Sequence, residues 1–520
     1  MQYRKRDFDQ NPSRGRGRCS RQRVYVFSVT PDDRHAVYRQ RIMQLDAPHP
    51  QGTSLEVDPF IAHTVGDVSR PRANVVLNRE LPNMPGASGT WSALANMFSM
   101  MRQGSAHLNA QVRQFGPVYK HMMGPTPIVC VSDADLLVRI ARNEDKAWST
   151  ALAYRELFAG VMPGVQTVDF LTTFDFDLHR DVRKVLQPAF SPAALASYVD
   201  IAAAAYEPAI ESWLRHGAVR FKPAVRRLFA DVAGRIFMGI DDAHEAKMLD
   251  VATANVWQSL TTPLRNAWLS PTWSRALRGY RTLQAELLRR VPERRERAGS
   301  DLFSRLCQAS GDTDLLDDEG VVRLFIGIML AAFDTTSLGV ASMGYLLATQ
   351  PAWQERLREE GARGTWKELE QHEWVWKETL RMYPVASGIP RVTLRDVQLA
   401  GYRVPARTMV LCFISPALQD PSLWTQPQRF DPERFSPQRA EDKRHRAAFL
   451  AFGSGAHTCI GMQLANLESK VFWRALLSRA SIRLAKPYRA RHQFAPLGSV
   501  SGEVDLVLQP RQSGGCRGSI

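Results

Sequence analysis

Hydrophobic residues recur with a helical period over most of the chain, from the segment GTWSALANMFSMM at residue 89 to about residue 385. Within that span, PVYKHMMGPTPIVCVS predicts two short strands around a Gly124–Pro125 turn. After residue 385, the short β-like runs PRVTLRD, VQLAGYRVPA and TMVLCFIS lead into a proline-rich irregular stretch, and a final helix is predicted to begin near Cys459. This order predicts a mainly α, single large domain with a small β-sheet over residues 81–510.

One predicted helix, over residues 321–350, is apolar around its whole circumference. At about 1.5 Å per residue it is long enough to cross a bilayer. Its middle holds the sequence FDTT, however, and a carboxylate at the centre of a membrane span costs roughly 2.5–3.5 kcal/mol. We therefore expect a core helix and no membrane span. Asp334, Thr335 and Thr336 are poor residues for a helix interior, so they are expected to have a function.

Composition and charge bear mainly on the ends of the chain. Sixty-seven Lys and Arg against 52 Asp and Glu give a net charge of +15, which alone does not choose among nucleic acid, anionic membrane and an acidic protein partner. Residues 1–80 are polar and irregular, which predicts a disordered basic extension; a nucleic-acid or membrane arm is the alternative, but no aromatic interleaving or amphipathic pattern supports it. Residues 511–520 are expected to form a flexible tail. The start shows no signal-peptide pattern and the six cysteines form no CxxC pair, so we expect a cytoplasmic protein without a disulfide framework.

The stretch AFLAFGSGAHTCIG, residues 448–461, places one thiol on a glycine-rich turn before the final helix. Backbone amides and a helix N-terminus favour the thiolate of Cys459, which would make it a nucleophile or a soft metal ligand. A small buried hydrophobic residue is the alternative. His457 is two residues before Cys459. At this spacing the two side chains need not contact each other, so the sequence does not indicate a nucleophile with its base. The glycines instead favour a bulky flat group lying against the backbone.

This stretch resembles the haem-binding signature of the cytochrome P450 superfamily, the haem-thiolate monooxygenases. The matching residues are Phe452, Gly453, Gly455, His457, Cys459 and Gly461. The resemblance implies a haem b cofactor held between the long helix and the Cys459 helix, with Cys459 as the axial thiolate on the iron and Phe452, Gly453 and His457 at the haem. Such a thiolate donates electron density that favours O–O cleavage, and backbone amides are expected to hydrogen-bond the sulfur.

Two charged motifs match the same family in the same order. KETLR, residues 377–381, with RFDPERF, residues 429–435, resembles the family's buried Glu-x-x-Arg pair completed by a downstream arginine. The triad would be Glu378, Arg381 and Arg434, with a structural role behind the haem; alone, the first pair would be one weak helical salt bridge.

A second set of family positions would hold the haem propionates. In LHRDVRKVLQPAFS, His179 and Arg183 share one helical face, and Arg391 follows the Glu-x-x-Arg helix. Taken without the resemblance, these are surface charges. With His457, the resemblance implies four candidate groups for two carboxylates, and forked hydrogen bonds from guanidinium suit such acceptors.

The sequence AAFDTT, residues 331–336, resembles the family's oxygen-activation motif, with Asp334 as the acid and Thr335 as the alcohol. An acid and an alcohol deliver protons through held water in a mostly dry pocket. The alternative is a helix bend made by threonine hydroxyls that bond back to the preceding turn. Ala332 departs from the usual glycine, and its methyl group is expected to narrow the distal pocket.

The family implies insertion of one atom of dioxygen into an organic substrate, with electrons from a separate donor of the ferredoxin or flavodoxin type. A peroxide-driven or isomerising haem-thiolate enzyme and a non-catalytic haem sensor are the alternatives. The basic segment 439–449 is either a solvated face or a docking patch for that donor. Mostly apolar segments around residues 154–170, 385–389 and 496–501 favour a hydrophobic substrate such as a fatty acid, terpenoid or polyketide. No nucleic-acid partner is expected.

Overall fold

The computed structural model describes residues 81, 83–86, 89–123, 126–158, 170–240, 243–259, 266, 268–297, 299–311, 315–493 and 497–511. The predicted extension over residues 1–80 and the predicted tail beyond residue 511 lie outside these residues.

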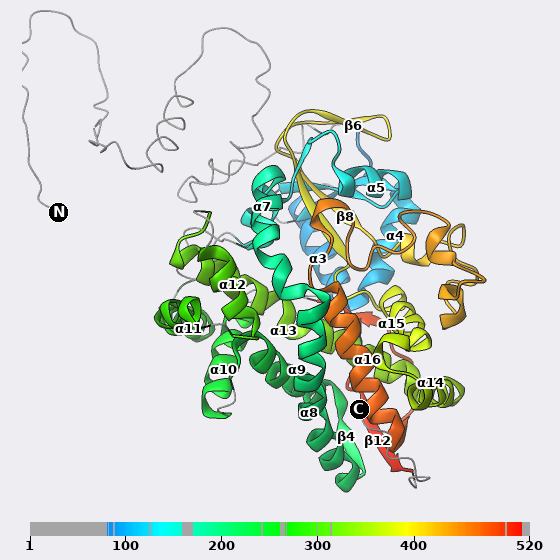
Figure 1. Ribbon diagram of the computed structural model, residues 1–520. Coiled ribbons are helices and arrows are strands. Elements are labelled where there is room, and N and C mark those ends of the chain that lie inside the picture. The colour runs from blue at the N-terminus through cyan, green and yellow to red at the C-terminus, as the bar shows by residue number, and fades with distance from the viewer. Residues whose placement is uncertain are drawn as a thin grey trace, which may run out of the picture. The chain divides into compact units, whose positions relative to one another are not determined.

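Helices make up most of the described chain (Figure 1). They are α3 (Thr90–Gln103), α4 (Ser105–Phe115), α5 (Ala134–Arg142), α6 (Thr150–Phe158), α7 (Phe176–Leu186), α8 (Pro192–His216), α9 (Phe221–Met238), α10 (Ala243–Ser259), α11 (Pro271–Glu296), α12 (Leu302–Gly311), α13 (Asp318–Ala348), α14 (Pro351–Arg363), α15 (Glu370–Met382) and α16 (Met462–Arg479). The prediction of a mainly α fold is confirmed.

The strands form one larger sheet and three small ones. The strands are β1 (Val118–Met123), β2 (Thr126–Val131), β3 (Trp148–Ser149), β4 (Ala218–Arg220), β5 (Gly388–Thr393), β6 (Val397–Leu399), β7 (Tyr402–Val404), β8 (Met409–Phe413), β9 (Ala480–Leu484), β10 (His492–Gln493), β11 (Ser499–Val500) and β12 (Asp505–Pro510). The larger sheet has the order β1-β2-β8-β5-β3, with β2 parallel to β8 and the other pairs antiparallel. It joins the predicted hairpin near residue 124 to strands that come after residue 385 in the chain.

Helix α13 lies in the core of the molecule. Asp317 caps its N-terminus by accepting a hydrogen bond from the Gly320 N–H at 2.7 Å. Its length and composition meet the criteria for a membrane span, but 65% of the apolar window is buried within the protein, as in a core helix. It packs against α9, α11 and α15, and its apolar side chains join those of α8, α9 and α16 in the largest hydrophobic cluster. Helix α13 is therefore a core helix that shares its hydrophobic cluster with α16, the helix that follows the Cys459 segment.

Candidate active site

The Cys459 loop is a tight turn that presents backbone N–H groups to the thiol. The Cys459 N–H donates to the Phe452 carbonyl at 2.8 Å, which closes the loop. Gly453 and Gly455 have φ of +74° and +70°, a backbone region that side chains rarely adopt. A Cβ on Gly455 would also lie 2.5 Å from the Ala141 carbonyl oxygen, so this glycine is required by both conformation and space.

The backbone N–H groups of Gly461 and Met462 lie near the Cys459 sulfur and lower the pKa of its thiol. The side chain keeps an exposed surface, although the surrounding protein raises the pKa of the thiol by desolvation. The two N–H groups and the positive charge of Arg183 act in the opposite direction on this pKa. The two N–H groups and Arg183 thus favour the thiolate, which is the form in which a cysteine binds a metal ion.

The predicted acid, Asp334, is held in an ion pair. Its Oδ1 accepts a hydrogen bond from Arg226 Nε of α9 at 2.6 Å, with 16% of the Asp334 side chain and 41% of the Arg226 side chain exposed. The sequence did not indicate Arg226, because it lies 108 residues from Asp334 in no motif. Arg226 thus fixes the position of the Asp334 carboxylate, which stays partly exposed.

The predicted alcohol, Thr335, bonds back within α13. Its hydroxyl donates to the Ala331 carbonyl at 2.9 Å, and α13 continues without interruption to Ala348. The alternative interpretation of this motif was a threonine hydroxyl that bonds to the preceding turn of its own helix. Thr335 makes such a bond, and the helix is not broken there. Ala331 is exposed, and Ala332, Asp334 and Thr335 are half-buried, so this turn of α13 is not enclosed by the hydrophobic core. The Thr335 oxygen keeps acceptor capacity on that side of the helix.

Four residues predicted to bind carboxylates come together from three segments: His179 and Arg183 of α7, Arg391 of β5, and His457. The His179 and His457 rings have centroids 4.0 Å apart. Arg183 Nη1 donates to the Thr458 carbonyl at 2.8 Å, which ties α7 to the Cys459 loop. Burial lowers the pKa of His179 to about 4 and holds the pKa of His457 well below its usual range.

Several polar atoms of this cluster have no protein partner. Among the described residues, His179 Nε2, His457 Nδ1 and Arg391 Nε are buried without a hydrogen bond. Buried donors without acceptors are costly, and a buried guanidinium without a carboxylate more so. The cluster therefore fits an anionic ligand with carboxylates beside the Cys459 sulfur, which describes the propionate edge of a haem.

Asp175, which the sequence did not indicate, lies inside this cluster. Its Oδ1 is 3.9 Å from His457 Nε2, and its side chain is 2% exposed. Burial raises its pKa, while hydrogen bonds and the charge of Arg391 oppose that rise. In the sequence, Asp175 could be noticed only because it lies four residues before His179. That position by itself indicates no more than the N-cap of the helix that carries His179.

The predicted triad behind the loop is formed and fully buried. Arg381 Nε donates to Glu378 Oε2 at 2.7 Å, and Arg434 Nε donates to Glu378 Oε1 at 3.2 Å. A fourth member, Glu441, was not predicted; it accepts from Arg434 Nη1 at 3.0 Å. Two buried arginines are thus matched by two buried carboxylates.

Two of the predicted substrate-lining segments lie side by side and border α13. The Gly498 N–H donates to the Val385 carbonyl at 2.7 Å, and the Val500 N–H donates to Ser342 Oγ of α13 at 3.1 Å. Most of the segment 154–170 lies outside the described residues.

Comparison with known proteins agrees with this geometry. The family model described as cytochrome P450 matches residues 85–498. The chain is 32% identical to putative cytochrome P450 136 of Mycobacterium tuberculosis, over 80% of this chain and 87% of that protein. It is 31% identical to cyclooctat-9-en-7-ol 5-monooxygenase of Streptomyces melanosporofaciens, over 64% of this chain and 76% of that protein.

A solved structure shows the same fold. Retinoic acid bound cyanobacterial CYP120A1 superposes with a TM-score of 0.69 at 24% identity and covers 78% of this chain and 95% of its own. The chain therefore belongs to the cytochrome P450 family, the haem-thiolate monooxygenases, and haem is its cofactor.

Proposed function

We propose that the protein inserts one atom of dioxygen into a hydrophobic organic molecule, with Cys459 as the thiolate ligand of the haem iron. The observation that carries this proposal is a buried cluster with donors that have no hydrogen-bond partner, next to the loop whose backbone N–H groups favour the Cys459 thiolate. Haem with a thiolate ligand supplies the oxygen-activating chemistry. In this assignment His179, Arg183, Arg391 and His457 hold the propionates, while Phe452 and Gly453 support the macrocycle.

Proton delivery is assigned to Asp334 and Thr335. The Asp334 carboxyl group gives up and takes up the proton, Arg226 holds this carboxyl in position, and the Thr335 oxygen can accept a hydrogen bond from a water that passes the proton on. The peroxide-driven alternative does not need this relay.

Isotope labelling separates these reactions. Holoenzyme with oxygen-18 dioxygen and a reducing system should place one labelled atom in the product and the other in water. Product that forms only with added peroxide would favour the peroxide-driven enzyme. Thr335→Ala should release hydrogen peroxide in place of product, and Thr335→Ser should restore product. An unchanged product yield in Thr335→Ala would contradict the assignment of this hydroxyl.

The substrate class is proposed to be hydrophobic and largely hydrocarbon. The names of related proteins mention cyclooctat-9-en-7-ol and cholesterol, and the similar structure has retinoic acid bound. All three molecules are mostly apolar with few polar groups, which suits a pocket lined by apolar segments. Spectral shifts of the ferric holoenzyme with a library of such molecules test this class, and shifts confined to charged, hydrophilic molecules would contradict it.

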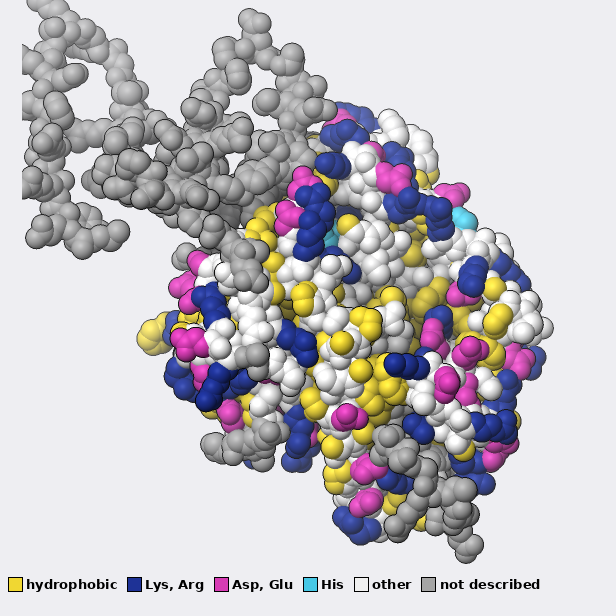
Figure 2. All heavy atoms as spheres, viewed as in Figure 1, with side chains coloured by type: hydrophobic (Ala, Val, Ile, Leu, Met, Phe, Trp, Pro, Cys, Tyr) yellow, Lys and Arg dark blue, Asp and Glu magenta, His cyan; other side chains and the backbone are white. Residues whose placement is uncertain are grey.

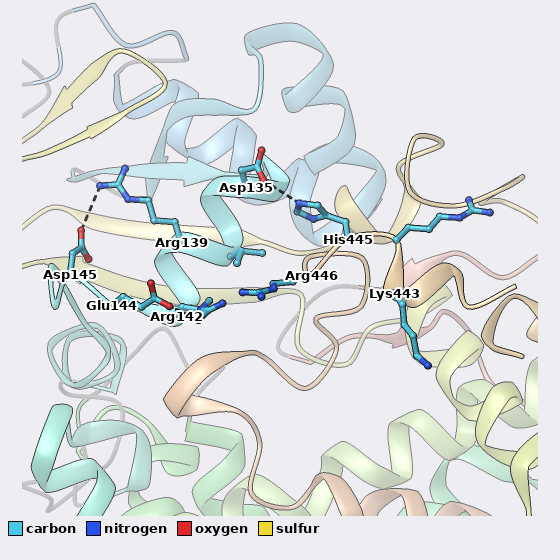
Figure 3. A pocket seen from close by; sticks show the side chains of 10 residues that line it. Asp135, Arg139, Arg142, Glu144, Asp145, Lys443, His445 and Arg446 are labelled. Carbon is cyan, nitrogen blue, oxygen red and sulfur yellow. Dashed lines mark hydrogen bonds and ion pairs between the residues drawn. The ribbon is translucent and has the colours of Figure 1, made fainter. Parts of the chain in front are cut away.

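The electron donor is proposed to be an acidic protein of the ferredoxin or flavodoxin type. On the face in Figure 2, charged side chains of both signs surround a middle region rich in hydrophobic and uncharged side chains. A pocket between α5 and the segment before the Cys459 loop is rich in cations (Figure 3). We call it the α5 pocket; its residues are Asp135, Val138, Arg139, Arg142, Glu144, Asp145, Lys443, Arg444, His445 and Arg446.

Not all cations of the α5 pocket are available to a partner. Arg139 pairs with Asp145 at 3.5 Å, and Arg444 is bound by Glu441 at 3.4 Å, the Leu423 carbonyl and the Thr425 hydroxyl. Within the described part of the chain, Lys443 and Arg446 have no ion pair. These two side chains are therefore the better candidates for contact with an acidic partner.

Charge reversal tests this surface. Lys443→Glu and Arg446→Glu should slow electron transfer at low salt, with a smaller difference from wild type at high salt, and should leave substrate spectral shifts unchanged. Arg297→Glu, an exposed change at the end of α11, is the control. Equal rates in all three variants would contradict docking at the α5 pocket. Arg444→Glu is unsuitable, because it also breaks the bond to Glu441.

A further inference from the structure

Asp175 is the buried carboxylate at the meeting point of the segments that carry the haem-edge residues. It occupies the N-cap position of α7, yet its side chain makes no capping bond to its own helix. A residue at this position ordinarily accepts a hydrogen bond from the second or third N–H of its helix. The Asp175 side chain instead turns to another element.

That element is the start of α6. Asp175 Oδ1 accepts hydrogen bonds from the backbone N–H groups of Thr150 and Ala151 at 2.9 and 3.2 Å, and Oδ2 accepts from Ser149 Oγ at 2.5 Å. Ser149 Oγ itself accepts from the Leu152 N–H at 2.9 Å. A carboxylate at a helix N-terminus with three donors is strongly held.

The same bonds connect Asp175 to the strand that carries Arg391. Ser149 lies in β3 and pairs with Val392 of β5, the residue after Arg391. On the other side, Asp175 Oδ1 lies 3.9 Å from His457 Nε2, and the Asp175 carbonyl accepts the N–H of His179 at 3.1 Å. The segments that carry His179, Arg391 and His457 thus all meet at Asp175.

The backbone next to Asp175 is strained. Phe176, the first residue of α7, has φ of +50°, which is unusual for a bulky side chain. Such a conformation persists only where its surroundings fix it, and the three hydrogen bonds to Asp175 fix the adjacent residue. The start of α7, and with it His179 one turn later, is held in place by this carboxylate.

We propose that Asp175 is a positioning residue of the haem site, which holds His179, Arg391 and His457 in register and places a fixed negative charge beside them. This rests on the proposed assignment of those residues to the haem propionates. Asp175 acts through its neighbours. Its charge offsets that of Arg391, and a negative charge within the haem site favours the ferric over the ferrous state.

The test compares Asp175→Asn with Asp177→Asn in the holoenzyme. The Asp175→Asn variant keeps one acceptor oxygen for the start of α6 but loses the charge. Asp177 lies on the same helix with 70% of its side chain exposed and pairs only at the surface with Arg180. The rate of haem transfer to apomyoglobin, the reduction potential of the iron and the free energy of unfolding are measured for each variant.

The change at Asp175 should speed haem release about tenfold, as for the hydrogen-bond partners of ligands at other metal sites, and should raise the reduction potential. The change at Asp177 should leave both quantities as in wild type. Asp175→Asn is used because an alanine variant loses both the charge and the acceptor.

A double-mutant cycle separates positioning from simple capping. Combined with His457→Gln, Asp175→Asn should lose most of its effect on haem release, because the two residues act as a unit. Additive effects of the two substitutions on haem release would overturn the proposal. So would an Asp175→Asn variant that unfolds more easily but keeps the wild-type haem release and reduction potential. In either case Asp175 would be a helix cap only. A wild-type protein without a thiolate-type spectrum would mark failure of the proposed function instead.

Discussion

At the scale of single residues, the proposed proton delivery depends on Asp334, which Arg226 holds in an ion pair. Asp334→Asn removes the carboxyl group and should lower kcat by on the order of 100-fold or more, within the usual range for general acid–base groups. Arg226→Leu removes the 2.6 Å partner and should lower kcat less, because the carboxyl group that carries the proton remains. Turnover in light and heavy water measures both, and the exposed neighbour variant Arg227→Leu is the control. Wild-type turnover in Asp334→Asn would contradict the relay.

Glu468 of α16 gives a prediction about pH. Burial raises the pKa of this carboxyl to about 8, whereas its ordinary value is 4.5. Between these values the unfolded chain releases the proton while the folded protein keeps it. The folded state therefore loses up to about 1.4 kcal/mol of stability per pH unit as pH rises toward 8. The loss is complete above the folded-state pKa.

Glu468→Gln should remove this slope. Denaturant unfolding at several pH values from about 5 to 9 measures this effect. The free energy of unfolding of the variant should rise relative to that of wild type as the pH rises to about 8. A difference between the two proteins that does not change with pH would contradict a buried, neutral Glu468. The exposed Glu359→Gln serves as the control.

The candidate site residues divide according to whether they belong to a local motif. His179, Arg183, Arg391, His457 and Cys459 were named from their match to motifs of the P450 family, and the structure brings the first four together beside the Cys459 loop. The charged residues that could not be predicted each have a partner that is distant in sequence or on another element; they are Asp175, Arg226 and Glu441. The hydrogen-bond or ion-pair partner of each of these residues becomes evident only in the folded structure.

At the scale of elements, the buried charges behind the Cys459 loop give the clearest prediction. Glu378 binds Arg381 and Arg434, and the Asp431 N–H donates to it at 2.9 Å, so it links α15 to the segment 429–435. Glu378→Gln leaves two buried guanidinium groups short of a charge and should lower the free energy of unfolding by about 3–5 kcal/mol.

Denaturant unfolding measures this loss. Glu433→Gln is the matched control, because the ion pair of Glu433 with Arg356 is half exposed and should contribute less than about 1 kcal/mol. If Glu378→Gln and Glu433→Gln lower the free energy of unfolding equally, burial of the triad does not determine how much the triad contributes to stability.

Elements with a strong hydrophobic period were predicted well. The long helix predicted over residues 321–350 is α13 over Asp318–Ala348, and the final helix predicted near Cys459 begins at Met462. The hairpin strands on either side of residue 124 and the short strands after residue 385 are also present. The pairing of β2 with β8 was not predictable, since period alone does not say which distant strands meet.

At the scale of the whole molecule, residues far apart in the chain are brought together at the Cys459 loop. Helix α7 supplies His179 and Arg183, the sheet supplies Arg391, and the loop before α16 supplies Cys459 and His457. The fold class and the family could be predicted from sequence, because several motifs occur in one order over most of the chain. The α5 pocket could be predicted only as a basic segment, since the cations that are already paired became evident from the structure.

The central claim is that Cys459 ligates the haem iron as a thiolate, and the carbon monoxide spectrum of the reduced holoenzyme tests it most directly. A strongly red-shifted Soret band is predicted for the wild-type protein, with loss of that band in Cys459→His. The variant Cys412→Ser, which changes a buried thiol in β8, should keep the band. A histidine-type spectrum from the wild-type protein would contradict the account.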